Sequence, residues 1–289
     1  MTRVLVNLLW LVPGVVGGSE DSTTDALMAV GESIASDGAG DLEVHLAVLE
    51  QFADAHPELA ERFDLHVLDQ DGRDKPRRVL AEQTWLPAVT RSLAAEVVHH
   101  AGGVVPFVHP GRTVLTVHDL QPLDLPHNFR PAKRNYIRLM AARSARAADI
   151  VTVPSRFTRE RVIERLGAAP ARVEVVPWWV APPRSQDTSE PFPLPPTLGG
   201  DRFVLYPAIT YPHKRHDVLL DAFALVAARH PRLRLVLTGG ALASDPDGDL
   251  QADALDHQPA QLVDGEARGV ELDGGLGAQG REALSLEDQ

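Results

Sequence analysis

The sequence predicts an α/β fold: one complete unit with a parallel sheet between two layers of helices, followed by the start of a second such unit. Three observations support this prediction. Short apolar runs alternate with helical segments over residues 1–180, which is the pattern of doubly wound sheets. A proline-rich segment at residues 181–200 interrupts the alternation. A strand-helix-strand pattern then resumes at residues 201–240, as in the first crossover of a second Rossmann-like domain.

The first unit contains seven apolar runs that we expect to be strands of one sheet. The helical segments between them carry apolar residues three and four positions apart. The helix after Ser155 is the best delimited, because Ser155 is a suitable N-cap and Gly167 follows the last turn. The expected strands are 3–12, 42–49, 63–68, 97–99, 113–117, 150–153 and 173–176, and the expected helices are 21–36, 76–96, 131–147 and 155–166.

The apolar run at residues 4–16 has two interpretations. A short apolar core behind Arg3 is also found in secretory signals. Asn7 and Pro13 interrupt the run, and no small-residue cleavage site precedes the acidic pair at 20–21, so a buried first strand is favoured. No run approaches the roughly 20 apolar residues that span a bilayer. We therefore expect a cytoplasmic protein.

The remainder of the chain is expected to fold only in part. Proline prevents the segment 181–200 from continuing a helix or an inner strand, which indicates a linker. In residues 201–240 we expect strands at 203–206 and 233–237 and a helix at 217–229. Residues 241–289 lack Phe, Tyr and Trp and contain 12 acidic but only two basic residues. Such a segment buries too little apolar surface to order itself, so a disordered acidic tail is predicted.

Composition excludes several kinds of site. The chain has no cysteine, which excludes disulfides and thiolate metal ligands and fits a reducing cytoplasm. The net charge of −12 argues against nucleic-acid binding, which depends on cationic neutralisation of phosphates. No His-Glu-x-x-His or comparable spacing occurs, so neither a metal site nor another cofactor is expected.

Gly17, Gly18, Ser19 and Glu20 stand between the first strand and the first helix. Glycine lets the backbone approach a ligand closely, and a helix N-terminus offers unpaired N–H groups to an anion. These four residues are therefore candidates for phosphate binding. A plain strand-to-helix turn is the competing interpretation.

His118 and Asp119 follow an expected inner strand, at the sheet edge where open parallel sheets bind their ligands. A histidine there can exchange a hydrogen bond with a sugar hydroxyl while a carboxylate orients it. The alternative is a loop histidine beside a turn-forming aspartate.

Two basic segments each have a functional and a structural interpretation. His213, Lys214 and Arg215 precede the helix of the second unit and could clamp a phosphate, or they could form a solvated loop that caps the helix. The helix at 133–146 carries four arginines and suits either a membrane surface or solvent. The pair Trp178-Trp179 could stack on a sugar or pack beside the linker.

Taken in order, these segments resemble the retaining glycosyltransferases of sequence family 4, which have the GT-B fold. The resemblance implies that the N-terminal domain holds the acceptor and the C-terminal domain the nucleotide-sugar. It places Gly17 and Gly18 near the donor diphosphate, His118 on the transferred sugar and Lys214 on the departing nucleoside diphosphate, without a metal. The matching segments are the turn at 17–20, VHDL at 117–120, PSRFTRERVIERLGAAPARVEVVPWWV at 154–180 and YPAITYPHKRHDVLLDAFALVAARHPRLRLVLTGG at 206–240.

The sequence also departs from this family. Ile209 stands five residues before Lys214, where an arginine is common, and Trp178-Trp179 replaces the usual Asn-Gly-Val-Asp-like turn. The two late glutamates, eight positions apart, that grip the donor have no counterpart after residue 240. The chain is then either an active transferase of envelope or exopolysaccharide assembly, completed by a partner chain, or a truncated remnant that binds an acceptor or a protein. The abrupt change in composition near residue 241 is what a reading-frame shift would produce.

Overall fold

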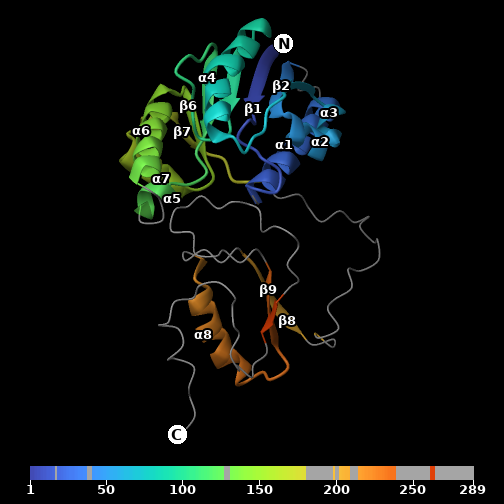
Figure 1. Cartoon of the computed structure of the whole chain (residues 1–289), viewed down its shortest axis with the longest axis vertical. Coiled ribbons are helices and arrows are strands. Elements are labelled where there is room, and N and C mark those ends of the chain that lie inside the picture. Colours follow the sequence, from blue (N-terminus) through green and yellow to red (C-terminus); the bar gives the residue numbers. More distant parts are fainter. Residues whose placement is uncertain are drawn as a thin grey trace. The chain divides into compact units, whose positions relative to one another are not determined.

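The computed structural model describes residues 1–16, 18–37, 41–126, 131–179, 198, 202–208, 214–238 and 261–263. The chain forms two compact units, Met1–Arg184 and Ser185–Gln289 (Figure 1). The boundary falls within the expected linker at 181–200, most of which lies outside the described residues.

A seven-stranded, all-parallel sheet forms the centre of the first unit (Figure 1). Its strand order is β3-β2-β1-β4-β5-β6-β7. The α/β fold class predicted from the sequence is thereby confirmed. The strands are β1 (Thr2–Asn7), β2 (Leu42–Leu49), β3 (Asp64–Leu68), β4 (Val97–His100), β5 (Arg112–Thr116), β6 (Ile150–Val153) and β7 (Val173–Val175).

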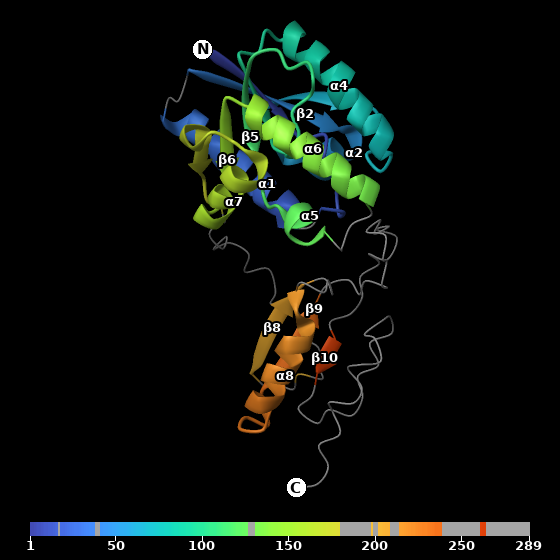
Figure 2. The same cartoon turned by 90° about the vertical axis from the view of Figure 1, so that its left-hand side faces the viewer.

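Helices cover the sheet on two sides (Figures 1 and 2). One side carries α1 (Gly18–Asp37), α2 (Glu50–Ala55) and α3 (Pro57–Ala60), and the other carries α4 (Lys75–Ser92), α6 (Pro131–Ala147) and α7 (Arg156–Leu166). The one-turn helix α5 (Gln121–Asp124) follows β5. Right-handed crossovers explain this division, because the chain first moves from β1 towards β3 and then returns to the other half of the sheet. None of the described helices is long and apolar enough to cross a membrane.

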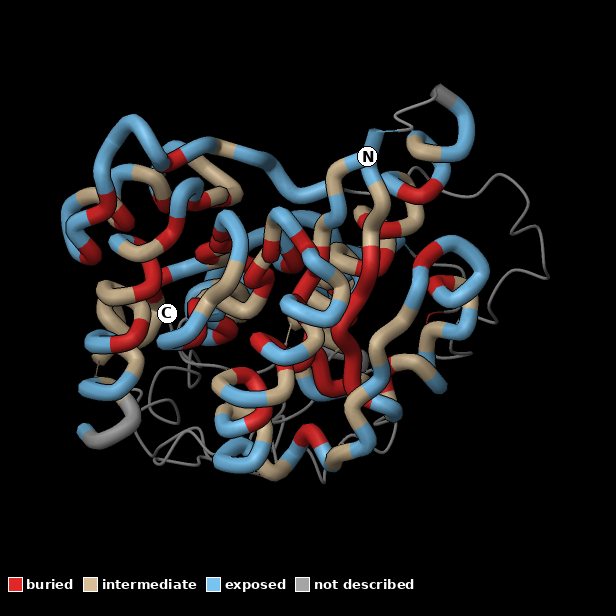
Figure 3. The backbone as a smooth tube through the Cα atoms, turned by 90° about the horizontal axis from the view of Figure 1, so that it is seen from above, coloured by how far each residue is buried: buried red, intermediate tan, exposed pale blue. Residues whose placement is uncertain are grey.

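Two apolar clusters form the core of the first unit. One surrounds the carboxyl half of β1 and β2 and includes Leu46, Phe52 and Leu86. The other joins β5 and β6 to α6 and α7, with Leu115 and Val151 fully buried. Figure 3 shows buried residues along the central strands and exposed ones on the outer turns of the helices. Both helical layers are therefore anchored to the sheet by apolar contacts.

Local hydrogen bonds explain where the elements begin and end. β1 was expected to reach residue 12 but ends at Asn7, because the Asn7 side chain accepts the N–H of Leu9 at 3.2 Å and bends the chain. In α7 the hydroxyl of Ser155 accepts the N–H of Thr158 at 3.1 Å, and Gly167 closes the helix at φ 70°. The short helices α2, α3 and α5 were not expected, since four to six residues show no periodicity.

The second unit contains β8 (Phe203–Pro207), α8 (His216–Ala227) and β9 (Arg234–Thr238), with β8 and β9 parallel. A three-residue strand, β10 (Gln261–Val263), pairs antiparallel with β9. It lies in the segment 241–289, for which no strand was expected; the rest of that segment is outside the described residues. Val204 and Leu205 are 43% and 50% exposed, so the one described helix leaves much of β8 uncovered.

Candidate functional site

The order of the strands places a topological switch point at the carboxyl ends of β1 and β4. β1 pairs with β2 on one side and with β4 on the other, so the chain leaves these two strands in opposite directions. Ligands bind open parallel sheets at such switch points. Asn7 and His100 end the two strands in register, and Asn7 Nδ2 donates to His100 Nδ1 at 3.5 Å. Both side chains are buried, and they join the two strands at the switch point.

His118 lies just after β5 at this edge, where the sequence predicted a ligand-binding histidine. Its Nε2 donates a hydrogen bond to the carbonyl oxygen of Ala101 at 2.9 Å. Because a carbonyl only accepts, the proton is on Nε2 and Nδ1 holds a lone pair. Nδ1 is buried and has no hydrogen-bond partner among the described residues. This nitrogen is therefore an unused acceptor.

Burial lowers the pKa of His118, while the bond to Ala101 and the carboxylate of Asp119 partly oppose this effect. An imidazole with a lowered pKa is neutral at pH 7. Since neutral Nδ1 cannot donate, the ligand atom that it suits is a donor such as a hydroxyl.

Two indole rings enclose the imidazole of His118. Its ring centroid lies 5.4 Å from that of Trp10 and 5.7 Å from that of Trp178. Trp10 packs tightly on Gly102, where an added Cβ would lie 2.5 Å from Trp10 Cγ. The indole N–H of Trp10 is buried without a partner among the described residues. Among the described residues, these two neighbouring rings thus carry one donor and one acceptor that have no hydrogen-bond partner.

A chain of polar side chains crosses the sheet beside this pair. His99 Nε2 lies 2.7 Å from the hydroxyl of Thr116, which lies 2.8 Å from the hydroxyl of Thr152. Burial, with a smaller contribution from nearby His118, lowers the pKa of His99 to about 4. His99 and Trp10 were given no site role in the sequence analysis. Their position at the ends of the two central strands was the available signal.

Asp119 forms the turn that opens α5. Its carboxylate accepts the backbone N–H of Gln121 at 3.0 Å and the side-chain amide of the same residue at 3.1 Å. This geometry agrees with the turn interpretation of Asp119. Asp119 also acts electrostatically on His118, because its carboxylate raises the pKa of the imidazole.

The glycine turn is only partly described, because Gly17 lies outside the described residues. Gly18 and Ser19 begin α1, and a Cβ on Gly18 would have no atom within 4 Å. Both oxygens of Glu20 are engaged: one accepts the N–H of Gly14 at 2.9 Å and the other lies 2.9 Å from Nε2 of His56. The Glu20 carboxylate therefore fixes the loop before α1 to the segment between α2 and α3.

The basic cluster of the second unit lies at the start of α8, and His213 is outside the described residues. The side chain of Lys214 is exposed, and its carbonyl oxygen accepts the hydroxyl of Tyr206 at 2.6 Å. Arg215 has a left-handed φ of 52° and pairs with Asp217 at 2.9 Å. Arg215 thus makes the local contact that a helix-capping loop would make, while the Lys214 ammonium is exposed to solvent.

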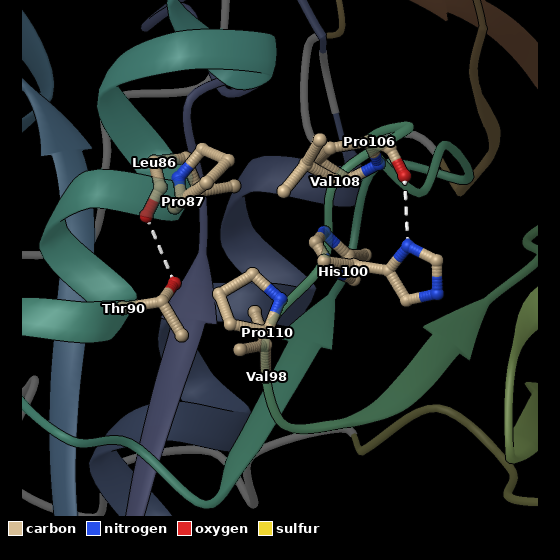
Figure 4. Close-up of a pocket in the computed structure, with 9 residues that line it drawn as sticks. Leu86, Pro87, Thr90, Val98, His100, Pro106, Val108 and Pro110 are labelled. Atoms are coloured by element: carbon tan, nitrogen blue, oxygen red, sulfur yellow. Dashed lines mark hydrogen bonds between the residues drawn. The ribbon is translucent and has the colours of Figure 1, made fainter.

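A small cavity lies on the α4 side of the sheet (Figure 4). His100, Pro106 and Pro110 face Leu86 and Thr90 of α4 across about 10 Å³, which is room for one water molecule. Burial lowers the pKa of His100 to about 3, and its Nε2 has no partner among the described residues. This cavity is too small for a sugar.

A larger polar hollow of about 300 Å³ opens near the carboxyl ends of β1 to β3. It is lined by Val12, Pro13, Gln51, Asp71 and Arg73. Its lining combines an amide, a carboxylate and a guanidinium, which together both donate and accept hydrogen bonds. No group of three His, Asp or Glu side chains suited to a metal occurs in the described part of the chain.

Comparison with solved structures agrees with this architecture. Anabaena HepE (Alr3699) in complex with UDP-glucose superposes with a TM-score of 0.52 at 18% identity, covering 85% of this chain and 62% of HepE. A proposed UDP-N-acetylglucosamine 2-epimerase of Listeria monocytogenes gives 0.52 at 14% identity, with 84% and 64% covered. At these identities the likeness shows the fold, which is GT-B-like. The chain spans less than two thirds of the length of either structure.

Sequence comparison identifies the family. No curated protein sequence matches the chain. The model of Glycosyltransferase Family 4 matches residues 38–184, more than half of the 289 residues. The matched region includes His99, His118 and Trp178, which lie at or near the switch point. The chain therefore belongs to glycosyltransferase family 4.

Proposed function

We propose that the protein transfers a sugar from a nucleotide-sugar donor to a hydroxyl acceptor, with retention of configuration. The observation that carries this proposal is the neutral imidazole of His118, whose unpaired Nδ1 lies at the switch point of a parallel sheet. A sugar hydroxyl is the donor that this nitrogen suits. Family membership supports the proposal, as does the capture of HepE with UDP-glucose.

In this proposal His118 holds the transferred sugar. Its bond to Ala101 fixes the orientation of the ring, so that Nδ1 is presented to the substrate without reorganisation. Asp119 acts indirectly, by holding the turn after β5. Retention follows if the acceptor attacks from the side that the leaving group vacates.

We assign the donor diphosphate to two segments, the glycine turn at 17–20 and the basic cluster at 213–215. Gly18 and Ser19 form the N-terminus of α1, with Gly17 before them in the sequence, and the dipole of a 20-residue helix favours an anion there. Lys214, with His213 and Arg215 beside it, neutralises the charge that develops on the departing nucleoside diphosphate. These groups stabilise the transition state more than the ground state, and they replace a metal.

The acceptor is assigned to the first unit. The polar hollow lined by Gln51, Asp71 and Arg73 is close in size to a small-molecule site. Its mixed donors and acceptors suit the hydroxyls of a glycan or a lipid-linked sugar, as expected in polysaccharide assembly. Glu20 contributes indirectly, since it fixes the loop that precedes α1.

A contact with the inner face of the membrane is part of the proposal. α6 contains Arg134, Arg138, Arg143 and Arg146 and no acidic residue, although the chain as a whole has a net charge of −12. Leu139 and Tyr136 of the same helix are exposed. Arg138 and Arg146 are exposed, whereas Arg143 is partly buried and donates to the carbonyl oxygens of Val105 and Pro106. The two exposed arginines, on the same helix as exposed apolar side chains, suit an anionic lipid surface.

The second candidate function is a non-catalytic module that binds an acceptor or a protein. The observation in its favour is the second unit, in which Val204 and Leu205 of β8 are about half-exposed. A partner chain that covers β8 would complete this domain and restore transfer. In the absence of such a partner, the first unit would still offer His118 at the switch point and the polar hollow lined by Gln51, Asp71 and Arg73.

The test is release of nucleoside diphosphate from UDP-glucose or GDP-mannose by the purified chain, with and without a methyl glycoside acceptor. We expect turnover that falls about 10- to 100-fold in His118→Ala, because one hydrogen bond to the transferred sugar is lost. His230→Ala, which removes an exposed histidine, should match the parent. Lys214→Ala should lose more than tenfold, and Arg232→Ala, an exposed cation of the same unit, should not. No turnover with any donor favours the non-catalytic module.

A further inference from the structure

The chain leaves β7 through two adjacent, half-exposed tryptophans. The N–H of Val176 bonds to the carbonyl of Val153 at 2.8 Å and keeps the chain beside β6. After Pro177 come Trp178 and Trp179, which are 49% and 48% exposed. Two neighbouring exposed indoles present an apolar surface that is costly to hydrate, and such surfaces often mark a binding site.

Among the described residues, only one of these two indoles has a ring contact with His118. The Trp178 ring meets that of His118 nearly at right angles, at 73°. Trp179 has the same exposure and no ring contact among the described residues. The two side chains are thus matched in type, exposure and chain position, and they differ in their relation to His118.

Two buried nitrogens near this contact, His118 Nδ1 and Trp10 Nε1, have no hydrogen-bond partner in the described part of the chain. His118 Nδ1 can only accept a hydrogen bond, and Trp10 Nε1 can only donate one. A sugar hydroxyl both donates and accepts, so one hydroxyl can pair with both nitrogens. Both atoms are shielded from solvent. Access therefore requires a neighbouring side chain to move, and Trp178 is the more exposed of the two indoles that flank His118.

We propose that Trp178 is the aromatic platform for the sugar ring that His118 holds. The C–H face of a pyranose packs on the indole of Trp178, and a hydroxyl on its rim pairs with His118 Nδ1 and Trp10 Nε1. Trp178 thus acts as a movable wall that packs against the His118 ring in the free protein and against the sugar ring in the complex. This inference rests on the proposed function in one respect, namely that a sugar binds at His118.

The experiment is an NMR titration of the full chain, with methyl α-glucopyranoside, methyl α-galactopyranoside, methyl N-acetyl-β-glucosaminide and UDP-glucose as separate probes. The chain has four tryptophans, so four indole N–H signals are expected, each assigned by a single substitution. At least one probe should shift the Trp178 and Trp10 signals saturably. The Trp85 signal should not shift, because that ring belongs to α4 and is partly buried against the core.

Three variants locate the platform. Trp178→Ala should weaken binding of that probe about tenfold, which is the scale of a lost aromatic stacking contact. Trp178→Phe should restore most of the affinity, and Trp179→Ala should stay within about twofold of the parent. Equal losses in Trp178→Ala and Trp179→Ala would overturn the proposal, as would a saturable shift that Trp178→Ala leaves unchanged.

The outcomes also separate this inference from sugar transfer. Trp178-dependent glycoside binding without nucleotide release supports the platform and rejects transfer by this chain. Nucleotide release that Trp178→Ala leaves intact supports transfer and rejects the platform. Absence of a saturable shift with all four probes rejects the platform outright.

Discussion

Nε2 of His118 donates a hydrogen bond to the carbonyl oxygen of Ala101 at 2.9 Å. This bond joins the loop after β5 to the loop after β4, on neighbouring strands of the sheet. It also determines which nitrogen of the imidazole is left for a ligand. The surroundings of this pair allow quantitative tests that do not depend on knowing the substrate.

The contact between Gly102 and Trp10 should tolerate no larger residue. In Gly102→Ala the new Cβ would meet Trp10 Cγ at 2.5 Å, so the indole must move. We expect a loss of about 1–3 kcal/mol in unfolding free energy, as for other overpacked sites. Chemical denaturation measures it. Gly18→Ala, where a Cβ meets nothing within 4 Å, is the control and should not be destabilised; equal stability of the two variants would contradict the packing.

Glu20 should act mainly through the loop that it holds. Glu20→Ala leaves the N–H of Gly14 and the ring of His56 without their acceptor, which should cost about 1–2 kcal/mol. Asp21→Ala removes an exposed acid from the same helical turn and should cost less than half as much. Thermal unfolding of both variants tests this. If they unfold alike, the carboxylate of Glu20 does not stabilise the loop.

Glu82 should make stability fall as pH rises from about 5 to 8. Burial raises the pKa of Glu82 from 4.5 to about 7, opposed by Arg78, so between these values the folded state holds a proton that the unfolded state has released. The linkage relation gives a loss of about 3 kcal/mol over this window. Glu82→Gln removes it, so the variant should gain relative to the parent as pH rises.

Only the difference between parent and variant is informative, because His99 and His100 act in the opposite direction. Burial lowers their pKa values to about 4 and about 3, which makes stability rise as pH increases towards 6.5. Urea unfolding of parent and Glu82→Gln at pH 5, 6, 7 and 8 isolates the carboxyl. A constant difference across this range would mean that Glu82 titrates normally.

The arginines of α6 should direct binding to anionic vesicles. Arg138 is exposed on α6, and Arg138→Glu reverses one charge at the proposed surface. We expect a fall of roughly tenfold or more in binding to phosphatidylglycerol vesicles, at about 1 kcal/mol for each unit of charge. Arg156→Glu, at an exposed position of α7, is the matched control. Co-sedimentation with neutral and anionic vesicles measures both, and equal losses would argue for a general charge effect.

Much of the fold follows from local sequence signals. The elements 42–49, 131–147 and 150–153 were predicted with their observed bounds, because their apolar periodicity is long or is bounded by clear breaks. β1 ends at Asn7 because the side chain of Asn7, and not a neighbouring strand, accepts the N–H of Leu9. The apolar content of the segment does not reveal such a bond. His118 was found from its place after a strand, which is also a local signal.

The partners of His118 could not be found in this way. Ala101 lies 17 residues earlier in the chain, and Trp10 and Trp178 come from opposite ends of the first unit. Only the strand order brings them together, and that order depends on crossovers rather than on local propensity. The sequence therefore predicted the histidine but not its tautomer or its aromatic neighbours.

The central position of β1 has a consequence for how the protein is made. Asn7 pairs across the sheet with His100, 93 residues further along the chain. During synthesis the first strand can join β2 early, but its other edge stays unpaired until β4 has left the ribosome. Long-range parallel pairing of this kind is slow and exposes strand edges meanwhile. Recovery of native protein after dilution from denaturant should therefore fall as protein concentration rises, and overproduction should benefit from slower translation or lower temperature.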